Sequence, residues 1–389
     1  MLIISFDAVG DDEFDRLMEH PAFSSFSKQA AIFRGVPPIF VSNTYPIHAS
    51  IVTGAVPAIH GVISNTERFP VKYPKWNSGE NNIRVKALWQ AAAEKGIETA
   101  AVFWPVTAFS KSVRYNIPEV LPVPGQSQII TSLMAGSKWL QFKMLLRHGK
   151  LLEGTTQPSR DDFAAACMAD ILRENKPGLA LMHLTAYDSI CHKNGKGSGA
   201  LIPALESLDR NLARLLEAAG DDRDVMIFTD HSQVNVHTSV EPNDVLVKAG
   251  LLCREGDAYV PGESGCYIEC CGGSSFFHAG SLSSDRVGAV KESVGKSEGF
   301  RRYLTPEELH DAGYGDVAFG FCALPGYSYV AFLPGHKADH GYPPDMPEYD
   351  VFYMARGFGL RPGSFTRGGS LLDIAPLAAK RLGVSLLTA

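Results

Sequence analysis

The sequence has no long hydrophobic run, little cysteine and no excess of basic residues. None of its 389 positions belongs to an apolar stretch of about 18 residues or more, which excludes a membrane-spanning helix. The seven cysteines are an odd number in a long chain and fit reduced thiols better than a disulfide framework. Lys and Arg total 36 against 42 Asp and Glu, a net charge of −6. This balance disfavours a nucleic-acid polymer as partner, but not a small phosphorylated molecule.

Two further signals are missing. The chain opens on a strand-like apolar run, without the basic n-region, apolar h-region and cleavage site of a signal peptide, so we expect a cytoplasmic location. Cys253, Cys266, Cys270 and Cys271 lie close together but lack the paired CxxC spacing of zinc ribbons. We therefore expect ordinary thiols there. Nothing in the sequence sets the oligomeric state.

Short apolar runs rich in β-branched residues alternate with helix-like segments along most of the chain. The predicted strands are 2–6, 99–103, 178–184, 225–229, 329–333 and 351–355. The predicted helices are 85–95, 161–175, 204–219 and 370–382, three of which end at a glycine. This alternation predicts a doubly wound α/β fold, with a largely parallel central sheet flanked by helices. Ligands of such folds gather at the carboxyl ends of the strands.

Two stretches depart from this rhythm. Residues from about 107 to 160 contain Pro, Gly and an amphipathic helix at about 129–146, and indicate a helical excursion from the sheet. Residues 250–326 are rich in Gly, Ser and Cys, with a capping box at Thr305 and Glu308. We interpret 250–326 as an inserted cap subdomain over the site, and 1–249 together with 327–389 as the catalytic core.

Four of the apolar runs end in, or lead to, residues that bind metals. These residues are Asp7, Asp188 with His192, Asp230 with His231, and Asp339 with His340. The i, i+4 spacing of Asp188 and His192 would direct both side chains at one ion from a single helical turn. Carboxylates mixed with imidazoles suit Zn²⁺ first and Mn²⁺ second, whereas Ca²⁺ and Mg²⁺ prefer all-oxygen sites. Three of these Asp together with the three His could hold two ions, which favours phosphoryl transfer.

A nucleophile for that reaction is offered by Thr44. It precedes Tyr45 and Pro46 and an apolar helix from about 46 to 53 that ends at Gly54. Free backbone amides and the helix dipole favour an anion at such a helix start. Alone, Thr44 would be only a capping residue, but beside a metal its hydroxyl could ionise and attack phosphorus.

Six motifs in order carry a family resemblance: IISFDAVG, NTYPIHASIVTGAVPAIHGVISN, VFWPVT, YDSICH, IFTDHS and DHGYPPDMPEYDVFYMARG. The sequence resembles the alkaline phosphatase superfamily, and within it the type I phosphodiesterase/nucleotide pyrophosphatase family. The sulfatase branch places Cys or Ser before x-Pro-x-Arg, whereas here Thr44, Pro46 and His48 stand in those positions. Formylglycine chemistry is therefore not expected.

The resemblance implies an alkaline phosphatase-like fold and a set of site residues. One zinc would be held by Asp7, Thr44, Asp230 and His231, and the other by Asp188, His192 and His340. Asn65 would contact the phosphate, while His48 and His60 would be structural supports. A phosphothreonine would form on Thr44 and be hydrolysed. The implied partner is a small nucleotide-like diester or pyrophosphate.

Several alternatives stay open. A phosphomonoesterase or a phosphonate hydrolase of the phosphonoacetate type would use the same core, and Arg356 could supply the extra positive charge that a monoester needs. A catalytically silent metal-binding protein is disfavoured, because every matched ligand position is present. The aromatic candidates for stacking on a base, where ordinary packing is commoner, are Trp104, Tyr187, Phe276 and Phe277.

Overall fold

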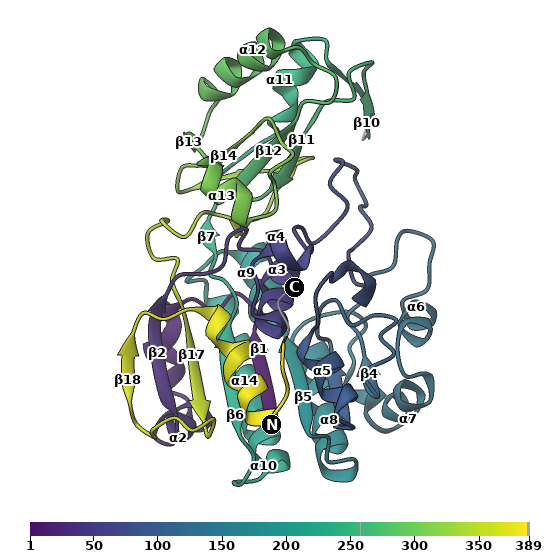
Figure 1. Ribbon diagram of the computed structural model, residues 1–389, viewed down its shortest axis with the longest axis vertical. Helices are drawn as coiled ribbons and strands as arrows, with labels where there is room; N and C mark the ends of the chain where they lie inside the picture. The colour runs from purple at the N-terminus through teal and green to yellow at the C-terminus, as the bar shows by residue number, and fades with distance from the viewer. Residues whose placement is uncertain (257, 387–389) are drawn as a thin grey trace.

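The structure, a computed structural model, describes residues 1–256 and 258–386 and is built on an eight-stranded sheet (Figure 1). The strand order is β18-β2-β17-β6-β1-β5-β3-β4. The bounds are β1 (Leu2–Phe6), β2 (Ala31–Val36), β3 (Thr99–Val102), β4 (Tyr115–Ile117), β5 (Leu179–Leu184), β6 (Val225–Thr229), β17 (Val351–Arg356) and β18 (Phe365–Arg367). Only β17 pairs antiparallel with its neighbours; all other pairs in this sheet are parallel. The prediction of a largely parallel α/β sheet is confirmed.

Helices cover both faces of this sheet. Along β1, Leu2, Ile4 and Phe6 join one buried hydrophobic cluster and Ile3 joins another, because successive side chains point to opposite faces. The first face is covered by α1 (Phe14–Met18), α2 (Pro21–Ser27), α8 (Ser159–Glu174) and α10 (Ile202–Ala219). The second is covered by α3 (Thr44–Thr53), α5 (Leu88–Glu94) and α14 (Ile374–Leu382). The two layers of helices explain why the strands are hydrophobic on both sides.

The excursion between β4 and α8 contains two helices. The sequence predicts one helix at about 129–146, but the chain forms α6 (Gln128–Ala135) and α7 (Lys138–His148). The break lies at Gly136, whose backbone is extended and where a Cβ would lie 2.4 Å from Pro118 Cδ and 2.6 Å from the Asn116 carbonyl oxygen. This close approach allows only glycine, so the prediction of a continuous helix is wrong.

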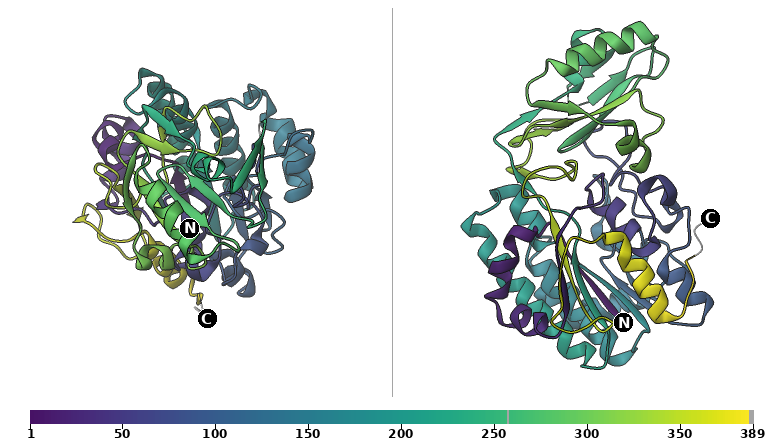
Figure 2. Two further views of the ribbon diagram at one scale, coloured as in Figure 1. Left: turned by 90° about the horizontal axis from the view of Figure 1, so that it is seen from above. Right: turned by 60° about the vertical axis from the view of Figure 1, so that its left-hand side comes forward.

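The inserted segment forms a second, antiparallel sheet that stands above the carboxyl edge of the central sheet (Figures 1 and 2). Its strand order is β11-β12-β14-β13, with β11 (Tyr267–Cys271), β12 (Ser274–His278), β13 (Phe300–Tyr303) and β14 (Phe319–Ala323). It is accompanied by the hairpin β9 (Leu252–Glu255) and β10 (Ala258–Pro261), and by α12 (Ser284–Gly295) and α13 (Pro306–Asp311). Its hydrophobic cluster also includes Leu246 of α11 (Asn243–Lys248), Tyr342 and Tyr349. The cap is thus packed against both segments that connect it to the core.

The segment between cap and β17 differs from the sequence prediction. A strand was expected at 329–333, but β15 (Tyr327–Tyr329) ends where that strand would begin, and pairs with β8 (Thr238–Val240) outside the central sheet. Pro334 has no N–H for a ladder, and residues 330–336 line a cavity instead. A second short pair joins β16 (Ala338–Asp339) to β7 (Val234–Asn235). Among the described residues, no helix is both long and apolar enough to cross a bilayer.

Gly341 offers a test of how this connecting segment fits against the cap. Its φ is +82°, and a Cβ there would lie 1.7 Å from the backbone oxygen of Cys271 in β11. We expect Gly341→Ala to lower the free energy of unfolding by more than about 2 kcal/mol, because backbone strain and a backbone clash add. Gly368→Ala is the matched control, since its φ is +86° with no atom within 4 Å of the added Cβ. Urea denaturation compares the two variants, and equal losses would mean that the Cys271 contact costs nothing.

Candidate active site

The topology brings the predicted site residues to one edge of the central sheet. Asp7 and Asp230 directly follow β1 and β6, and Asp188 lies in α9 (Ala186–Asn194), which follows β5. Because β17 runs antiparallel, the segment before it, with His340, enters at this same edge. Thr44 is the first residue of α3, which follows β2. The parallel strands therefore assemble the site from segments far apart in sequence.

The first group of potential metal ligands contains Asp7, Asp230 and His231, with Thr44 beside them. The Nε2 atom of His231 lies 3.5 Å from Asp7 Oδ1 and 3.4 Å from Asp230 Oδ2. The Thr44 hydroxyl lies 3.4 Å from the same nitrogen. All four side chains are buried. Two carboxylates, an imidazole and a hydroxyl thus converge on one point.

The hydrogen bonds of this group leave atoms free for a cation. Asp230 Oδ1 accepts from the Ala8 and His231 amides, and His231 Nδ1 donates to the Ser232 carbonyl. Asp7 Oδ1 and Asp230 Oδ2 are buried without a hydrogen-bond partner. Buried polar atoms are rarely left unsatisfied, so these two oxygens and His231 Nε2 fit a divalent metal ion.

The electrostatics of the buried site point the same way. Burial raises the pKa of Asp7 well above its usual range, with Asp230 and Asp188 adding to the rise. Burial also raises the pKa of Asp230 to about 6, and it lowers the pKa of His231 to about 4. The raised pKa values mean that ionising the two carboxyl groups is costly, and a bound cation would offset that cost. The lowered pKa of His231 means that its ring is already neutral, which is the form that binds a metal.

The second predicted set, Asp188, His192 and His340, also converges. His192 Nε2 lies 3.2 Å from Asp188 Oδ1, as the i, i+4 spacing predicts. His192 Nδ1 bonds to the Ala338 carbonyl oxygen and His340 Nδ1 bonds to Asn43 Oδ1, each at 2.8 Å, which leaves both Nε2 atoms for a ligand. Although burial opposes it, Asp188 raises the pKa of His192 to about 10.

The structure distributes this second set over two overlapping groups. Potential ligand atoms of Asp188, His231 and His340 lie within 4.8 Å of one another, as do those of His192, Asp339 and His340. Both oxygens of Asp339 already accept hydrogen bonds, from the Ser328 hydroxyl and the His340 amide. We therefore interpret Asp339 as a support of the His340 segment. No metal-compatible group found in the described ranges contains cysteine.

Asn65 and His48 hold the start of α3. Asn65 Oδ1 accepts a hydrogen bond of 2.8 Å from the Tyr45 amide, so its Nδ2 is the end available to a phosphate oxygen. His48 Nδ1 donates to the Thr44 carbonyl at 2.8 Å, and burial lowers the pKa of His48 well below its usual range. His60 is also fully buried, and its Nε2 bonds to Ser50 of α3.

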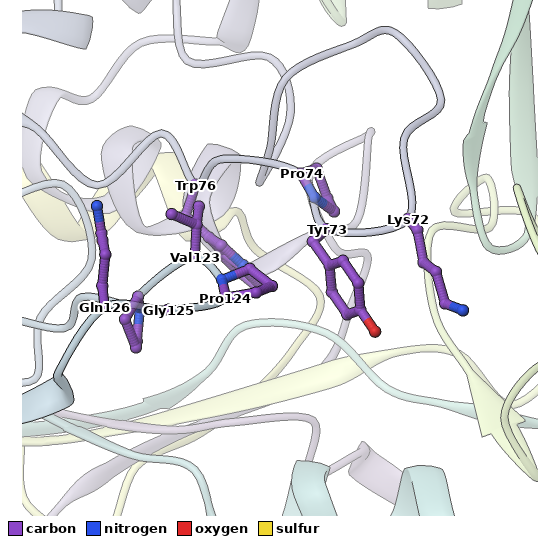
Figure 3. Close-up of a pocket in the computed structure, with 9 residues that line it drawn as sticks. Lys72, Tyr73, Pro74, Trp76, Val123, Pro124, Gly125 and Gln126 are labelled. Atoms are coloured by element: carbon purple, nitrogen blue, oxygen red, sulfur yellow. The ribbon is translucent and has the colours of Figure 1, made fainter. Parts of the chain in front are cut away.

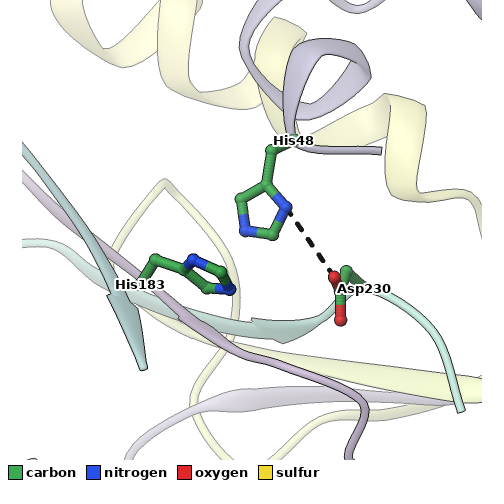
Figure 4. A group of neighbouring side chains, drawn as sticks. All are labelled: His48, His183 and Asp230. Carbon is green, nitrogen blue, oxygen red and sulfur yellow. Dashed lines mark ion pairs between the residues drawn. The ribbon is translucent and has the colours of Figure 1, made fainter. Parts of the chain in front are cut away.

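His183 in β5 is a member of the site that sequence reasoning missed. Figure 4 shows it beside His48 and Asp230, and the two histidine rings are 4.4 Å apart. Its Nε2 lies 3.1 Å from Asp7 Oδ2, while its Nδ1 faces the Phe103 carbonyl at 3.3 Å. Burial opposes the charged ring, but Asp7 and Glu119 raise the pKa of His183 well above its usual range. His183 therefore orients Asp7 through its Oδ2 atom. The only signal of this role in the sequence was a polar residue inside an apolar strand.

A cavity of about 690 Å³ is lined by Thr44 and Asn65 and by four of the proposed ligands, Asp7, Asp188, His192 and His340, whereas Asp230 and His231 are buried outside its lining. A second hollow of about 410 Å³ adjoins it and shares Lys72, Tyr73 and Trp76 with it (Figure 3). Trp76 packs against Tyr45, the residue after Thr44, with ring centroids 5.2 Å apart. The larger cavity alone has a volume typical of small-molecule ligand sites.

The prediction of which aromatic residues stack on a base is wrong. Trp104, Tyr187, Phe276 and Phe277 are fully buried in hydrophobic clusters, and Phe276 stacks on Tyr314 instead. The rings that line the cavity are those of Tyr73, Trp76, Phe332, Tyr45 and Tyr329. Sequence reasoning failed here because it weighted residues near motifs, while Tyr73, Trp76 and Phe332 come from loops.

The prediction that Arg356 could supply positive charge to the site is also wrong. Arg356 ends β17 opposite Val225, the first residue of β6, so it lies at the amino edge, away from the site. Its guanidinium donates there to the Gly220 carbonyl. The arginine that does line the cavity is Arg160, whose guanidinium lies 5.7 Å from the centre of the Phe103 ring.

Comparison with known proteins agrees with the motifs. Residues 1–294 match the family model described as type I phosphodiesterase/nucleotide pyrophosphatase. Murine ectonucleotide pyrophosphatase/phosphodiesterase 5, solved as an inactive variant with AMP, superposes with a TM-score of 0.72 at 14% identity, covering 100% of this chain and 96% of that one. The neighbour supports the fold predicted from the resemblance.

Two curated relatives differ in how much they share. Human ectonucleotide pyrophosphatase/phosphodiesterase family member 1 is 24% identical over 216 residues, which cover 51% of this chain and 19% of that protein. The bis(5'-adenosyl)-triphosphatase of Pongo abelii is 20% identical over 413 residues, covering 99% of this chain and 78% of that protein. The chain thus spans about a fifth of the first relative and most of the second.

The shifted pKa values predict how metal affinity depends on pH. Protons compete with a cation for Asp230, whose folded pKa is about 6, and for His192, whose folded pKa is about 10. Affinity for Zn²⁺ should therefore fall as pH falls through 6 and should still rise above neutrality as His192 is deprotonated. Competition with a chromophoric chelator between about pH 5 and pH 8 measures this. Asp230→Asn should flatten the acidic part of the curve; an equally flat curve for the wild type would contradict the assignment.

Proposed function

Because the chain belongs to the type I phosphodiesterase/nucleotide pyrophosphatase family, we propose that it is a two-metal phosphohydrolase acting through a phosphothreonine. Its substrates are phosphodiesters or pyrophosphates of nucleotide-like small molecules. Thr44 is the nucleophile and Asn65 contacts the phosphate. The ions are held by Asp7, Thr44, Asp230 and His231 on one side, and by Asp188, His192 and His340 on the other.

One observation carries this proposal. The Thr44 hydroxyl, at the first residue of α3, faces His231 Nε2 at 3.4 Å beside two buried carboxylate oxygens that have no hydrogen-bond partner. A hydroxyl in a merely capping role would need no such surroundings. Mixed carboxylate and imidazole ligands favour Zn²⁺, with Mn²⁺ as the next choice.

The side chains of the site divide the reaction between them. When bound, the ions would favour ionisation of a hydroxyl and neutralise phosphoryl charge. Thr44 Oγ1 forms the new bond to phosphorus as the bond to the leaving oxygen breaks, and the leaving group departs with the bonding electrons. The Nδ2 group of Asn65 stabilises a non-bridging oxygen. Attack by water then breaks the phosphothreonine and restores Thr44.

The cavity and the relatives support a nucleotide-like substrate. The cavity of about 690 Å³ is lined by Tyr73, Trp76 and Phe332, which can contact a flat base. The similar murine structure is described in complex with AMP, and the relative from Pongo abelii is named a bis(5'-adenosyl)-triphosphatase. Both support nucleotides as the first substrates to test.

Arg160 supports a second candidate, a phosphomonoesterase. A monoester carries one more negative charge than a diester at the scissile phosphate. Arg160 lines the cavity and has no carboxylate within 4.0 Å in the described part of the chain, so its charge is available to a dianion. Glu119 lines the same cavity but faces His183, with 3.7 Å between its Oε2 and Nδ1.

We expect Thr44→Ala to lower kcat for bis(p-nitrophenyl) phosphate by at least about 100-fold in zinc-reconstituted protein, because the nucleophile is lost. Thr44→Ser should keep much more activity, since it keeps the hydroxyl. Mass spectrometry of acid-quenched protein should find the phosphoryl adduct on the peptide containing Thr44 only when residue 44 carries a hydroxyl.

Zinc content and thermal unfolding serve as controls for Thr44→Ala. Asp7, Asp230 and His231 remain, so the variant should keep most of its bound zinc and its melting temperature. Full activity in a folded, zinc-loaded Thr44→Ala protein would exclude the covalent route. An inactive wild type with both sites filled would exclude the diesterase proposal and move phosphonates to the front.

Arg160→Gln separates the two candidate functions. If the guanidinium binds a phosphate dianion, the variant should lower kcat/KM for p-nitrophenyl phosphate by about tenfold or more and that for bis(p-nitrophenyl) phosphate by much less. Arg173→Gln, at the exposed end of the same helix, is the matched control. Equal losses on both substrates, or no monoester turnover by the wild type, would remove the monoesterase.

A further inference from the structure

The helices α6 and α7 expose an unusual amount of apolar surface. Sixteen large hydrophobic side chains are exposed in the described part of the chain, and seven of them lie within residues 129–146. These seven define the α6–α7 face: Ile129, Ile130, Met134, Trp139, Phe142, Leu145 and Leu146. Trp139 is 76% exposed and Leu146 is 73% exposed. So many exposed apolar side chains within one helix pair indicate an interaction site rather than ordinary scatter.

The packing of α7 explains why this face stays outside. Leu140 and Met144 point inward to the hydrophobic cluster that also contains Ile117 of β4. Trp139, Phe142 and Leu146 lie on the opposite side of the helix, and the Trp139 and Phe142 rings are 5.8 Å apart. The helix pair lies at the outer edge of the sheet, beside β4 (Figure 1). The fold therefore buries the inner face of α7 and leaves the outer face without a packing partner among the described residues.

The same segment is basic. Residues 120–152 contain four Lys or Arg and no Asp or Glu, a charge of +4 in a chain whose net charge is −6. Lys143 and Arg147 turn toward α8, where they pair with Glu174 and Asp170. Lys138 and Lys150 form no ion pair within 4.0 Å in the part of the chain that the structure describes. Apolar side chains flanked by unpaired lysines are complementary to an anionic lipid bilayer, whose negatively charged headgroups cover an apolar interior.

We propose that the α6–α7 face docks onto anionic phospholipid membranes, with its aromatic and aliphatic side chains inserted at the headgroup level. A second copy of this chain is a poorer occupant, since a two-fold contact would set the basic segment against itself. A nucleic acid would match the lysines but not the seven apolar side chains. None of the seven side chains of the α6–α7 face lines the site cavity, so docking does not depend on the proposed catalytic function.

Vesicle binding by the full chain tests this proposal. The protein should co-sediment with vesicles of phosphatidylcholine and phosphatidylglycerol at low salt, and much less with phosphatidylcholine alone. Of the four tryptophans, Trp89 and Trp104 are fully buried and Trp76 is half-buried against Tyr45, so a blue shift of tryptophan emission on binding should come mainly from the exposed Trp139. The double variant Trp139→Ser/Leu146→Ser should lower partitioning about tenfold or more and abolish the shift. The double variant Lys138→Glu/Lys150→Glu should lower binding to the anionic vesicles and leave the weak binding to phosphatidylcholine vesicles unchanged.

Phe365→Ser is the matched control, because Phe365 is 61% exposed on β18, at the other edge of the sheet. It should bind vesicles like the wild type. All variants should keep the wild-type melting temperature and hydrolase activity, since the changed side chains are exposed and lie outside the cavity. The proposal fails if the wild type does not bind anionic vesicles at low salt. It fails equally if light scattering finds a dimer that the Trp139→Ser/Leu146→Ser change dissociates and vesicle binding is absent.

Discussion

The buried carboxyl groups at the carboxyl edge of the sheet are the constraint on which the rest of the structure depends. β1, β5 and β6 are adjacent and parallel, so Asp7, Asp188 and Asp230 are brought to one place. Buried carboxylates repel one another and lose hydration, and the raised pKa values of Asp7 and Asp230 register this cost. Such an arrangement is stable only when positive charge is supplied nearby. Much of the surrounding structure supplies it.

Each carboxyl group has a different partner. His192 lies 3.2 Å from Asp188, His183 lies 3.1 Å from Asp7, and the Ala8 and His231 amides bond to Asp230. These partners fix one oxygen of Asp7 and one of Asp230, and leave the other oxygen of each without a hydrogen bond. The protein alone therefore balances only part of the charge. A site that is incomplete in this manner is better explained by a cation than by stability, because a structural network would satisfy both oxygens.

The sequence predicted the parts of this arrangement that local rules determine. The runs 2–6 and 225–229 are β1 and β6 to the residue, and the glycine after α3 ends that helix as expected. Placement of Asp7, Asp188 and Asp230 at one edge followed from parallel strands alone. What failed depended on tertiary packing: Gly136 breaks a helix because Pro118 and Asn116 crowd it, and Arg356 is remote because β17 runs antiparallel. His183 was missed because only its contact with Asp7 reveals its role.

The cap and the nucleophile are connected through His340. Its backbone oxygen accepts a hydrogen bond of 2.7 Å from Gly273, in the turn between β11 and β12 of the cap. Its ring bonds to Asn43, the residue before Thr44, and the next amide, of Gly341, donates to Ser42. One residue thus contacts the cap, the start of α3 and the potential metal ligands together. A displacement of the cap would move His340 relative to Thr44, so the segment that closes the cavity also determines the geometry in which the proposed nucleophile and the second ligand group meet.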